Sequence, residues 1–392
     1  MRLNVPELPA GEPVVTVILD ATRTSESGDQ TVLGRWADLR RQLHKQGTDG
    51  ALLEAIDDTV SRPTWLSGPH GRVVVAAGSR VYLDRSLAAP PGVDRAVVGD
   101  APHAFALARV ADCGVRYLLV TVDRAGADLS LHDTTDLQAT REQHSVEGDH
   151  DELAKPQLGP LAHKRIENRA EDSWERNAEV VATEIDRVVA ERRPELLLLT
   201  GDLRAVSLVR ADLGQSAREI LAEVEGGART EGVNNRAFDA AIGQALGEFR
   251  DRRREAALDH LRQEQGRDGA AVSGVEDVVE VLRRGQVAEL VITEEVAGPP
   301  SAIAQRLLWV GPGALELALT RSDLTDLGVT EPTELRADLA IGRAALEQGA
   351  GITVADADSV TLVDGVGAIL RWNDASTPGE TAYTRSTDRS RA

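Results

Sequence analysis

Residues 274–292 read GVEDVVEVLRRGQVAELVI, and this stretch decides how the last part of the chain folds. Apolar side chains recur at helical spacing over 274–286, which predicts a short amphipathic helix. The run AELVIT follows at once and ends at Thr293, which predicts a buried strand. A helix joined directly to a strand is the building unit of an α/β domain.

The same pattern continues to the end of the apolar sequence. Three more apolar runs predict strands, and a helix is expected between them at 334–348. The strands are expected at 306–311, 352–356 and 367–372. We therefore expect a carboxyl-terminal α/β domain over 273–373. Residues 374–392 are polar and rich in Ser and Thr, which predicts a disordered tail.

The amino-terminal part alternates between strands and helices in the same way. VVTVILD (14–20) reads as a buried strand, and helical spacing over 27–60 is broken by GTDG, so two helices joined by a tip are expected. Two hairpins and a helix between them should follow. They are expected at 72–87, 102–112 and 115–133. We assign residues 1–135 to a first α/β domain.

The middle part begins with a long stretch that has no apolar period. We expect an exposed loop over 141–165 within a middle domain spanning 136–272. A helix from Trp174 that Pro194 ends, the strand LLLLT (196–200) and a long helix to about residue 265 then predict another α/β layer. The fold class expected for the whole chain is α/β, with three domains.

Composition narrows the classes of function. The 392 residues carry a net charge of −20, which opposes non-specific binding to nucleic acid, so we expect no DNA partner. No apolar run approaches the roughly 18 residues that span a bilayer, and residues 1–13 hold no apolar stretch of signal-peptide length, so we expect neither membrane insertion nor secretion. The single cysteine, Cys113, cannot form an internal disulfide or a Cys-based metal cluster. We expect a cytoplasmic protein that needs no cofactor.

The carboxyl-terminal, middle and amino-terminal parts of the chain each resemble the archaeal and eukaryotic class-1 peptide-chain release factors and their relative Pelota. The 274–292 stretch is similar to the Gly-Val-Glu-Asp helix and strand of that family, and DGVGAILRW (364–372) is similar to its closing strand. HKRIENRAEDSWERNAEVV (163–181) resembles its basic helix after the catalytic loop, and residues 14–78 resemble its codon-reading domain. The resemblance implies three domains in release-factor order. Within the superfamily, the sequence most resembles the bacterial branch that includes Balon-like ribosome hibernation factors and their actinobacterial relatives.

Both reactive motifs of the release factors are missing. In place of Gly-Gly-Gln the chain reads KPQLGPLAHKR (155–165), with Pro160 at the second glycine and His163 where the glutamine would fall. Proline fixes φ and has no N–H to offer a substrate. The codon-reading Asn-Ile-Lys-Ser is also absent from the interhelical tip, which reads RRQLHKQGT (40–48). We therefore expect no stop-codon-dependent release.

What remains of the resemblance implies a ribosome-binding factor. It would occupy the A site of idle or stalled 70S ribosomes as a hibernation or stress factor that silences translation. There it would contact ribosomal RNA at the decoding and peptidyl-transferase centres. The resemblance also implies a contact with elongation factor Tu. An alternative is an enzyme, a peptidyl-tRNA hydrolase that rescues stalled ribosomes with Gln157 or His163 in place of the missing glutamine. A third hypothesis is an interaction protein that keeps the release-factor fold but binds other proteins and no longer binds the ribosome.

The three lysines mark the candidate RNA contacts. The chain holds 41 arginines but only Lys45, Lys155 and Lys164, and all three fall in the stretches that the family places against ribosomal RNA. Residues 34–48 and 153–170 each carry a local net charge of +3. Local cations of this kind contact phosphates. The candidate RNA-binding residues are Arg40, Arg41, His44, Lys45, Lys155, His163, Lys164 and Arg165.

Other chemistry is less well supported by the sequence. His144 and His150 lie six residues apart among acidic residues, but this spacing also suits a solvated linker, so no metal site is expected. Asp20 and Asp123 end predicted strands and would have to converge to hold a metal. The cluster Arg250 to Arg254 lies among acidic residues on the long helix, where pairing along the helix explains it. No catalytic residue is assigned beyond the candidates His163 and Gln157.

Overall fold

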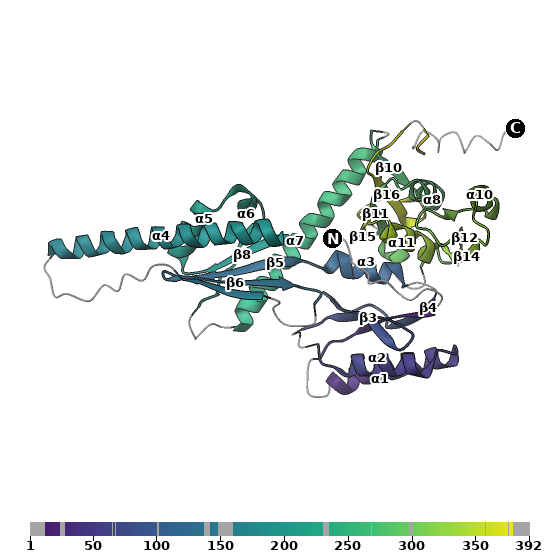
Figure 1. The fold of residues 1–392 in the computed structure, drawn as a ribbon, viewed down its shortest axis with the longest axis horizontal. Coiled ribbons are helices and arrows are strands. Elements are labelled where there is room, and N and C mark those ends of the chain that lie inside the picture. Colours follow the sequence, from purple (N-terminus) through teal and green to yellow (C-terminus); the bar gives the residue numbers. More distant parts are fainter. Residues whose placement is uncertain are drawn as a thin grey trace. The chain divides into compact units, whose positions relative to one another are not determined.

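The structure is a computed structural model, and its helices and sheets form three α/β assemblies in chain order (Figure 1). It describes residues 12–23, 28–64, 66, 68–99, 102–136, 142–147, 160–229, 235–267, 269–297, 301–356, 358–374 and 376–378. The chain divides into two compact units. The first is Met1–Gly114 together with Asp251–Ala392, and the second is Val115–Arg250.

The amino-terminal assembly is an antiparallel sheet covered on both faces. Its strands are β1 (Val14–Asp20), β2 (Gly71–Ala77), β3 (Arg80–Leu87) and β4 (Arg95–Gly99), in the order β3-β2-β1-β4. Helices α1 (Gly28–Lys45) and α2 (Gly50–Ser61) pack on one face and α3 (Ala104–Cys113) on the other. Every residue of β2 is buried, because alternate side chains meet different helices.

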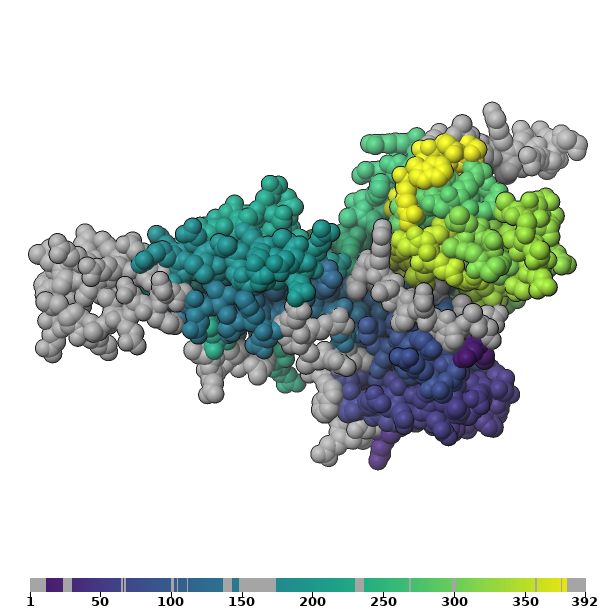
Figure 2. Space-filling model, in the orientation of Figure 1, coloured from purple at the N-terminus to yellow at the C-terminus, as the bar shows by residue number. Residues whose placement is uncertain are grey.

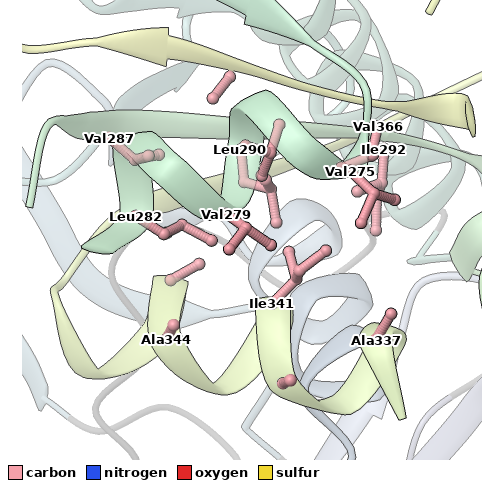
Figure 3. Close-up of a cluster of buried hydrophobic side chains, with 14 of the residues drawn as sticks. Val275, Val279, Leu282, Val287, Leu290, Ile292, Ala337, Ile341, Ala344 and Val366 are labelled. Carbon is pink, nitrogen blue, oxygen red and sulfur yellow. The ribbon is translucent and has the colours of Figure 1, made fainter. Parts of the chain in front are cut away.

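The carboxyl-terminal assembly belongs to the same unit. Its main sheet has the order β10-β16-β11-β15 and comprises β10 (Ala271–Ser273), β11 (Val287–Thr293), β15 (Gly351–Ala355) and β16 (Val366–Leu370). Figure 3 shows apolar side chains of α8 (Val275–Arg283) and α11 (Ala337–Glu347) pointing toward one another and toward β11. Phe105 and Ala108 of α3 join this core, so α3 packs between the two sheets of the unit.

Smaller elements complete the carboxyl-terminal assembly. A three-stranded sheet has the order β13-β12-β14, and a short helix packs beside it. These elements are α9 (Glu294–Ala297), β12 (Leu307–Val310), β13 (Leu317–Ala318), α10 (Arg321–Asp326), β14 (Thr333–Arg336) and the 3₁₀ turn η1 (Val363–Gly365).

The middle unit is built on a mixed sheet with the order β7-β6-β5-β8-β9. Its strands are β5 (Arg116–Val122), β6 (Gly126–Asp133), β7 (Glu142–Glu147), β8 (Leu196–Gly201) and β9 (Leu221–Glu223). Helices α4 (Pro160–Arg192), α5 (Leu203–Asp212) and α6 (Gln215–Glu219) lie on one face (Figure 1), and their teal surface is exposed in Figure 2. The first part of α7 (Asn235–Gln265) covers the other face.

The fold agrees with the α/β expectation and differs from the expected divisions. The hairpin β5–β6, expected in a first domain 1–135, pairs with β8 in the middle sheet. The unit boundaries therefore fall at 114/115 and 250/251, and the second lies inside α7 rather than near residue 272. The disordered tail predicted for 374–392 lies outside the described residues from position 379 onward. Among the described helices, none is both long and apolar enough to cross a bilayer.

Candidate nucleic-acid interface

The first predicted contact surface is the end of α1, where its last turn meets the turn to α2. The Arg40 guanidinium binds the carboxylate of Asp57 on α2, with Nε 3.0 and 3.1 Å from the two oxygens. The indole N–H of Trp36 donates to the same carboxylate at 2.5 Å. Arg40 thus joins α1 to α2, and part of its charge is used inside the unit.

Arg41, His44 and Lys45, the other predicted contacts at this tip, are exposed. Arg41 is paired with Asp38, one turn earlier on α1. Lys45 forms no ion pair with any residue that the structure describes, and it ends the helix. A cation in the last turn is favoured by the helix dipole and can contact a phosphate without losing an internal partner. Lys45 is therefore the strongest candidate for a phosphate contact among the residues predicted at the tip.

The second predicted surface is a helix rather than a loop over much of its length. The expected exposed loop 141–165 is wrong at both ends, because residues 142–147 form β7 and α4 begins at Pro160. Proline is well suited to the first helical position, where its missing N–H has no partner to lose. His163, Lys164 and Arg165 thus lie in the first two turns of α4. Lys155 and Gln157 lie outside the described residues.

The only Gly–Gly pair in the sequence is not a release-factor loop. Gly226 and Gly227 form a turn after β9, and Gly226 has a φ of 97°. Gly227 is buried, and its N–H donates to Thr200 Oγ1 at 3.1 Å. A Cβ at Gly227 would lie 2.5 Å from the Thr200 methyl carbon, so the glycine is required by packing.

A group of side chains that the sequence did not single out lies where β5 and β8 end. The guanidinium carbon of Arg124 lies 4.6 Å from the ring centre of Trp174, and that of Arg204 lies 5.0 Å from it. Trp174 had been assigned only to the apolar stripe of a helix. The signal that could have found the group is the pair of polar sequences Asp123-Arg124 and Asp202-Leu203-Arg204, each directly after a predicted strand.

A buried arginine fixes the turn that carries Arg124. Arg229, with its side chain 14% exposed, binds Asp123 at 2.9 Å and Asp128 at 3.2 Å. Although burial opposes it, hydrogen bonds from Arg229 and Ser145 hold the pKa of Asp128 below its usual range. Asp128 is therefore charged at neutral pH, and it shares Arg229 with Asp123 inside the unit.

The sequence candidates for metal chemistry do not converge. Asp20 binds Arg35 at 2.9 Å in the first unit, whereas Asp123 belongs to the middle unit. His144 pairs with Glu184 at 2.8 Å, and hydrogen bonds from Arg187 lower the pKa of Glu184, with His144 adding to the effect. Within the part of the chain that the structure describes, no three His, Cys, Asp or Glu side chains are grouped to hold a metal ion.

Comparison with models of known protein families finds a match for the middle of the chain. Residues 116–267 match the model described as bacterial archaeo-eukaryotic release factor family 2. This middle part of the chain is therefore similar to that bacterial release factor family. The match covers the whole middle sheet, α4, and the group of Arg124, Trp174 and Arg204.

Relatives and solved structures were also found. The chain is 25% identical over 368 residues to the protein Rv2629 of Mycobacterium tuberculosis, with 92% of this chain and 93% of that protein covered. Dom34 of Saccharomyces cerevisiae, a translation termination-like factor, matches 79% of this chain and 81% of its own at 11% identity, with a TM-score of 0.39. Pelota of Archaeoglobus fulgidus matches 78% and 80% at 12% identity, with a TM-score of 0.32.

Proposed function

We propose that this chain is a ribosome-binding factor of the release factor family that occupies the A site of idle or stalled ribosomes without catalysing release. It would act in the cytoplasm as a hibernation or translation-silencing factor, with ribosomal RNA at the decoding and peptidyl-transferase centres as its partner and elongation factor Tu as a further one. The observation that carries the proposal is the combination of the family match over 116–267 with a Gly226–Gly227 turn in which Gly227 is buried.

The charge distribution supports the same proposal. The molecule as a whole is acidic, which disfavours non-specific RNA binding, while Lys45 and the first turns of α4 are basic. In an otherwise acidic protein, two local basic segments can bind RNA phosphates that lie opposite them. The acidic remainder of the surface disfavours binding to other RNA.

Sedimentation with ribosomes tests the proposal directly. The protein is mixed with vacant 70S ribosomes and with 70S complexes that carry labelled peptidyl-tRNA, and both are pelleted through sucrose at about 150 mM salt. We expect the protein in both pellets and no release of labelled peptide. Absence from both pellets would contradict the proposal.

Lys45→Glu tests the tip contact. Losing one phosphate contact should weaken ribosome binding and lower the slope of log affinity against log salt by about 1. Arg210→Glu is the matched control, because it makes the same charge change at an exposed α5 side chain that pairs only with Glu223 among the described residues. Equal salt slopes for wild type and Lys45→Glu would remove the tip from the interface. Arg40→Glu is less informative, because it would also break the pair with Asp57.

The hydrolase alternative is decided by the peptide that the same experiment measures. If peptide is released, the double variant His163→Ala, Gln157→Ala should abolish release, because those residues would position the attacking water. Release that survives in the double variant would exclude this region as the active site.

A further inference from the structure

The end of α8 and helix α10 border an open groove on the carboxyl-terminal assembly. The groove has a volume of about 560 Å³, which is within the range of sites that take a small ligand or the anchoring side chains of a peptide. Its lining combines exposed leucines with carboxylates and a pair of arginines. The lining residues all belong to the first unit, and they lie outside the α1 tip and α4, on which the proposed function depends.

Leu327 is held outward by the backbone at the end of α10. Gly328, with a φ of 88°, donates its N–H to the Thr325 carbonyl at 3.0 Å. Val329 donates its N–H to the Leu324 carbonyl at 3.0 Å. This is the Schellman arrangement, in which Leu324 and Val329 pack together in the core. The side chain of Leu327, which lies between them in the sequence, is therefore left outside, and the residue is 58% exposed.

Leu315 lines the same groove from the turn between β12 and β13. A Cβ at Gly285, which follows α8 with a φ of 70°, would lie 3.6 Å from Leu315 Cδ2, so the leucine rests on bare backbone there. The Gln348 side chain fixes the turn to α8, because its Nε2 donates to the carbonyls of Leu282 at 2.9 Å and Ala314 at 3.1 Å. Leu315 is still 47% exposed. Two leucines on separate fixed turns thus present apolar surface to one groove, which is typical of an interaction site.

The carboxylates of α10 are available to bind a cation. Asp323 and Asp326 lie one turn apart on this helix and both line the groove. Neither forms an ion pair with any residue that the structure describes. The cation of the same helix, Arg321, lies over the Trp309 ring at 5.6 Å and is not part of the groove lining. The acidic side of the groove therefore has no cation of its own.

The two arginines at the end of α8 are already engaged by carboxylates. Arg283 binds Glu280 at 2.7 Å, and Arg284 binds the same carboxylate. Arg284 also donates to the Ser376 carbonyl at 3.0 Å and lies 3.9 Å from Asp374. Because acidic partners accompany both arginines, the unpaired carboxylates of α10 leave the groove with an excess of negative charge.

We propose that this groove is a docking site for a basic amphipathic segment of a protein partner, and we call its lining of Leu315, Asp323, Asp326 and Leu327 the Leu327 groove. An apolar side chain of the partner would pack between the two leucines, and lysines or arginines beside it would pair with the two aspartates. Charge complementarity selects this partner, because a phosphate-bearing or acidic ligand would be repelled by the unpaired carboxylates. The inference goes beyond the proposed function and does not depend on it.

Selection from a phage-displayed library of random dodecapeptides, with the immobilised full-length protein as bait, tests the site. We expect the recovered peptides to combine several lysines or arginines with a large apolar residue. The tightest binder is then synthesised with a fluorescein label, and its affinity is measured by fluorescence anisotropy. Recovery of no binding peptide, or of peptides that are acidic or uncharged, would overturn the proposal.

The double variant Leu315→Ser, Leu327→Ser tests the apolar contact. It should bind the labelled peptide at least about tenfold more weakly, because the two side chains supply the buried centre of the contact. Its urea unfolding midpoint should stay close to that of the wild type, since both side chains are largely exposed. Leu203→Ser is the control, because Leu203 is a leucine of the middle unit that is 83% exposed. Unchanged peptide binding by the double variant would overturn the proposal.

The double variant Asp323→Asn, Asp326→Asn tests the charge contact. It should weaken peptide binding about three- to tenfold at low salt and remove most of the salt dependence, because the charges that attract a basic partner are gone. Glu54→Gln, Asp58→Asn is the matched control, because these exposed carboxylates lie one turn apart on α2 of the same unit. Equal salt dependence for the wild type and the aspartate variant would overturn the proposal.

Two other occupants of the groove would show in the same measurements. A second copy of the chain would appear as a dimer in analytical ultracentrifugation that the leucine variant dissociates. The chain's own last residues, which include Arg385, Arg389 and Arg391, would appear as peptide binding that rises at least about tenfold when 379–392 are removed. Either result would overturn the assignment of the groove to a protein partner.

The outcome is separable from that of the ribosome experiment. A protein that pellets with ribosomes but selects no groove-binding peptide would overturn the Leu327 groove and leave the proposed function in place. Peptide binding that depends on the leucines and aspartates, in a protein that does not pellet with ribosomes, would support the groove and contradict the proposed function.

Discussion

His103 makes the stability of the first unit dependent on pH. Its side chain is 3% exposed, its backbone N–H donates to Thr16 Oγ1 at 2.9 Å, and its Nε2 lies 4.0 Å from Asp338 Oδ2. Burial lowers the pKa of His103 to about 4, and the charges of Arg95 and Arg336 act in the same direction, opposed by Asp338. The neutral ring is therefore the folded form.

The sign of the pH effect follows from this lowered pKa. An unfolded histidine binds its proton near pH 6.5, well above the folded pKa, so the unfolded state gains protons first as the pH falls. Its contribution to stability is complete above pH 6.5 and is lost as the pH falls toward 4, by on the order of 3 kcal/mol at most. Urea unfolding at pH 7.5 and 4.5 measures the change.

His103→Gln is the control for that measurement, because glutamine keeps a polar side chain and does not titrate. The carboxylates that titrate in the same range are common to both proteins, so the difference between the two pH profiles isolates His103. Identical profiles would show that His103 titrates normally in the folded state. The sequence offered no sign of this residue, because a histidine directly before a helix looks the same whether it is buried or exposed.

The arginines of α7 show what sequence spacing misses within an element. Pairing along the helix was the expected explanation for Arg253 and Arg254. Instead, Arg253 donates to the Gly114 carbonyl at 3.0 Å, and Arg254 binds Asp112 at 3.1 Å, with Asp251 of its own helix only at 3.9 Å. Contacts across 139 and 142 residues have no periodicity in the sequence that could reveal them.

Arg254→Gln should therefore destabilise the protein more than the loss of an ordinary surface pair. The variant leaves the Asp112 carboxylate, which is 11% exposed, without its cation, and we expect a cost of about 1 to 2 kcal/mol. Arg187→Gln, which breaks only pairs along α4, should cost less, because water can solvate the partners that it leaves. The free energies of urea unfolding compare the two, and equal losses would restore the explanation by pairing along the helix.

Strands were predictable where side chains are apolar and were missed where they are not. VVTVILD and LLLLT are strands as expected, and the hairpin between β2 and β3 turns at Gly78 as expected. β7 reads EQHSVE and was assigned to a loop, although it pairs with β6 along its whole length. Its pairing depends on backbone hydrogen bonds, which leave no pattern in a polar sequence.

The order of the assemblies along the chain was predictable, and their grouping was not. The sequence placed the β5–β6 hairpin with the amino-terminal strands because it follows them closely. In the structure β5 pairs in parallel with β8, with Tyr117 opposite Leu196, so the hairpin belongs to the middle sheet. The grouping of the first and last assemblies depends on α3, whose Phe105 faces one core and whose Leu107 faces another. The group of Arg124, Trp174 and Arg204 was missed for the same reason, because three separate segments supply its side chains.

The connectivity of the whole molecule makes a strong prediction about its units. The chain leaves the first unit after Gly114 and returns at Asp251, and the Arg253 guanidinium bonds the carbonyls of Asp112 and Gly114. The two junctions are thus held side by side within the first unit. The remaining part of α7 is also anchored there, because Leu258 and Leu261 are buried against the carboxyl-terminal sheet.

A protein in which a short Gly-Ser linker replaces residues 115–250 should therefore fold. We expect a single cooperative transition in urea and the same His103-dependent loss of stability below pH 6.5, because the residues around His103 all belong to the first unit. Residues 1–250 are the matched control. They keep α3 but lack its partners α11 and β11, so Phe105 would be exposed and the amino-terminal assembly should unfold at a lower urea concentration than in the linked protein. Two separate transitions in the linked protein would contradict this prediction. They would show that the amino- and carboxyl-terminal assemblies unfold independently although both contact α3, so that the two do not form a single unit.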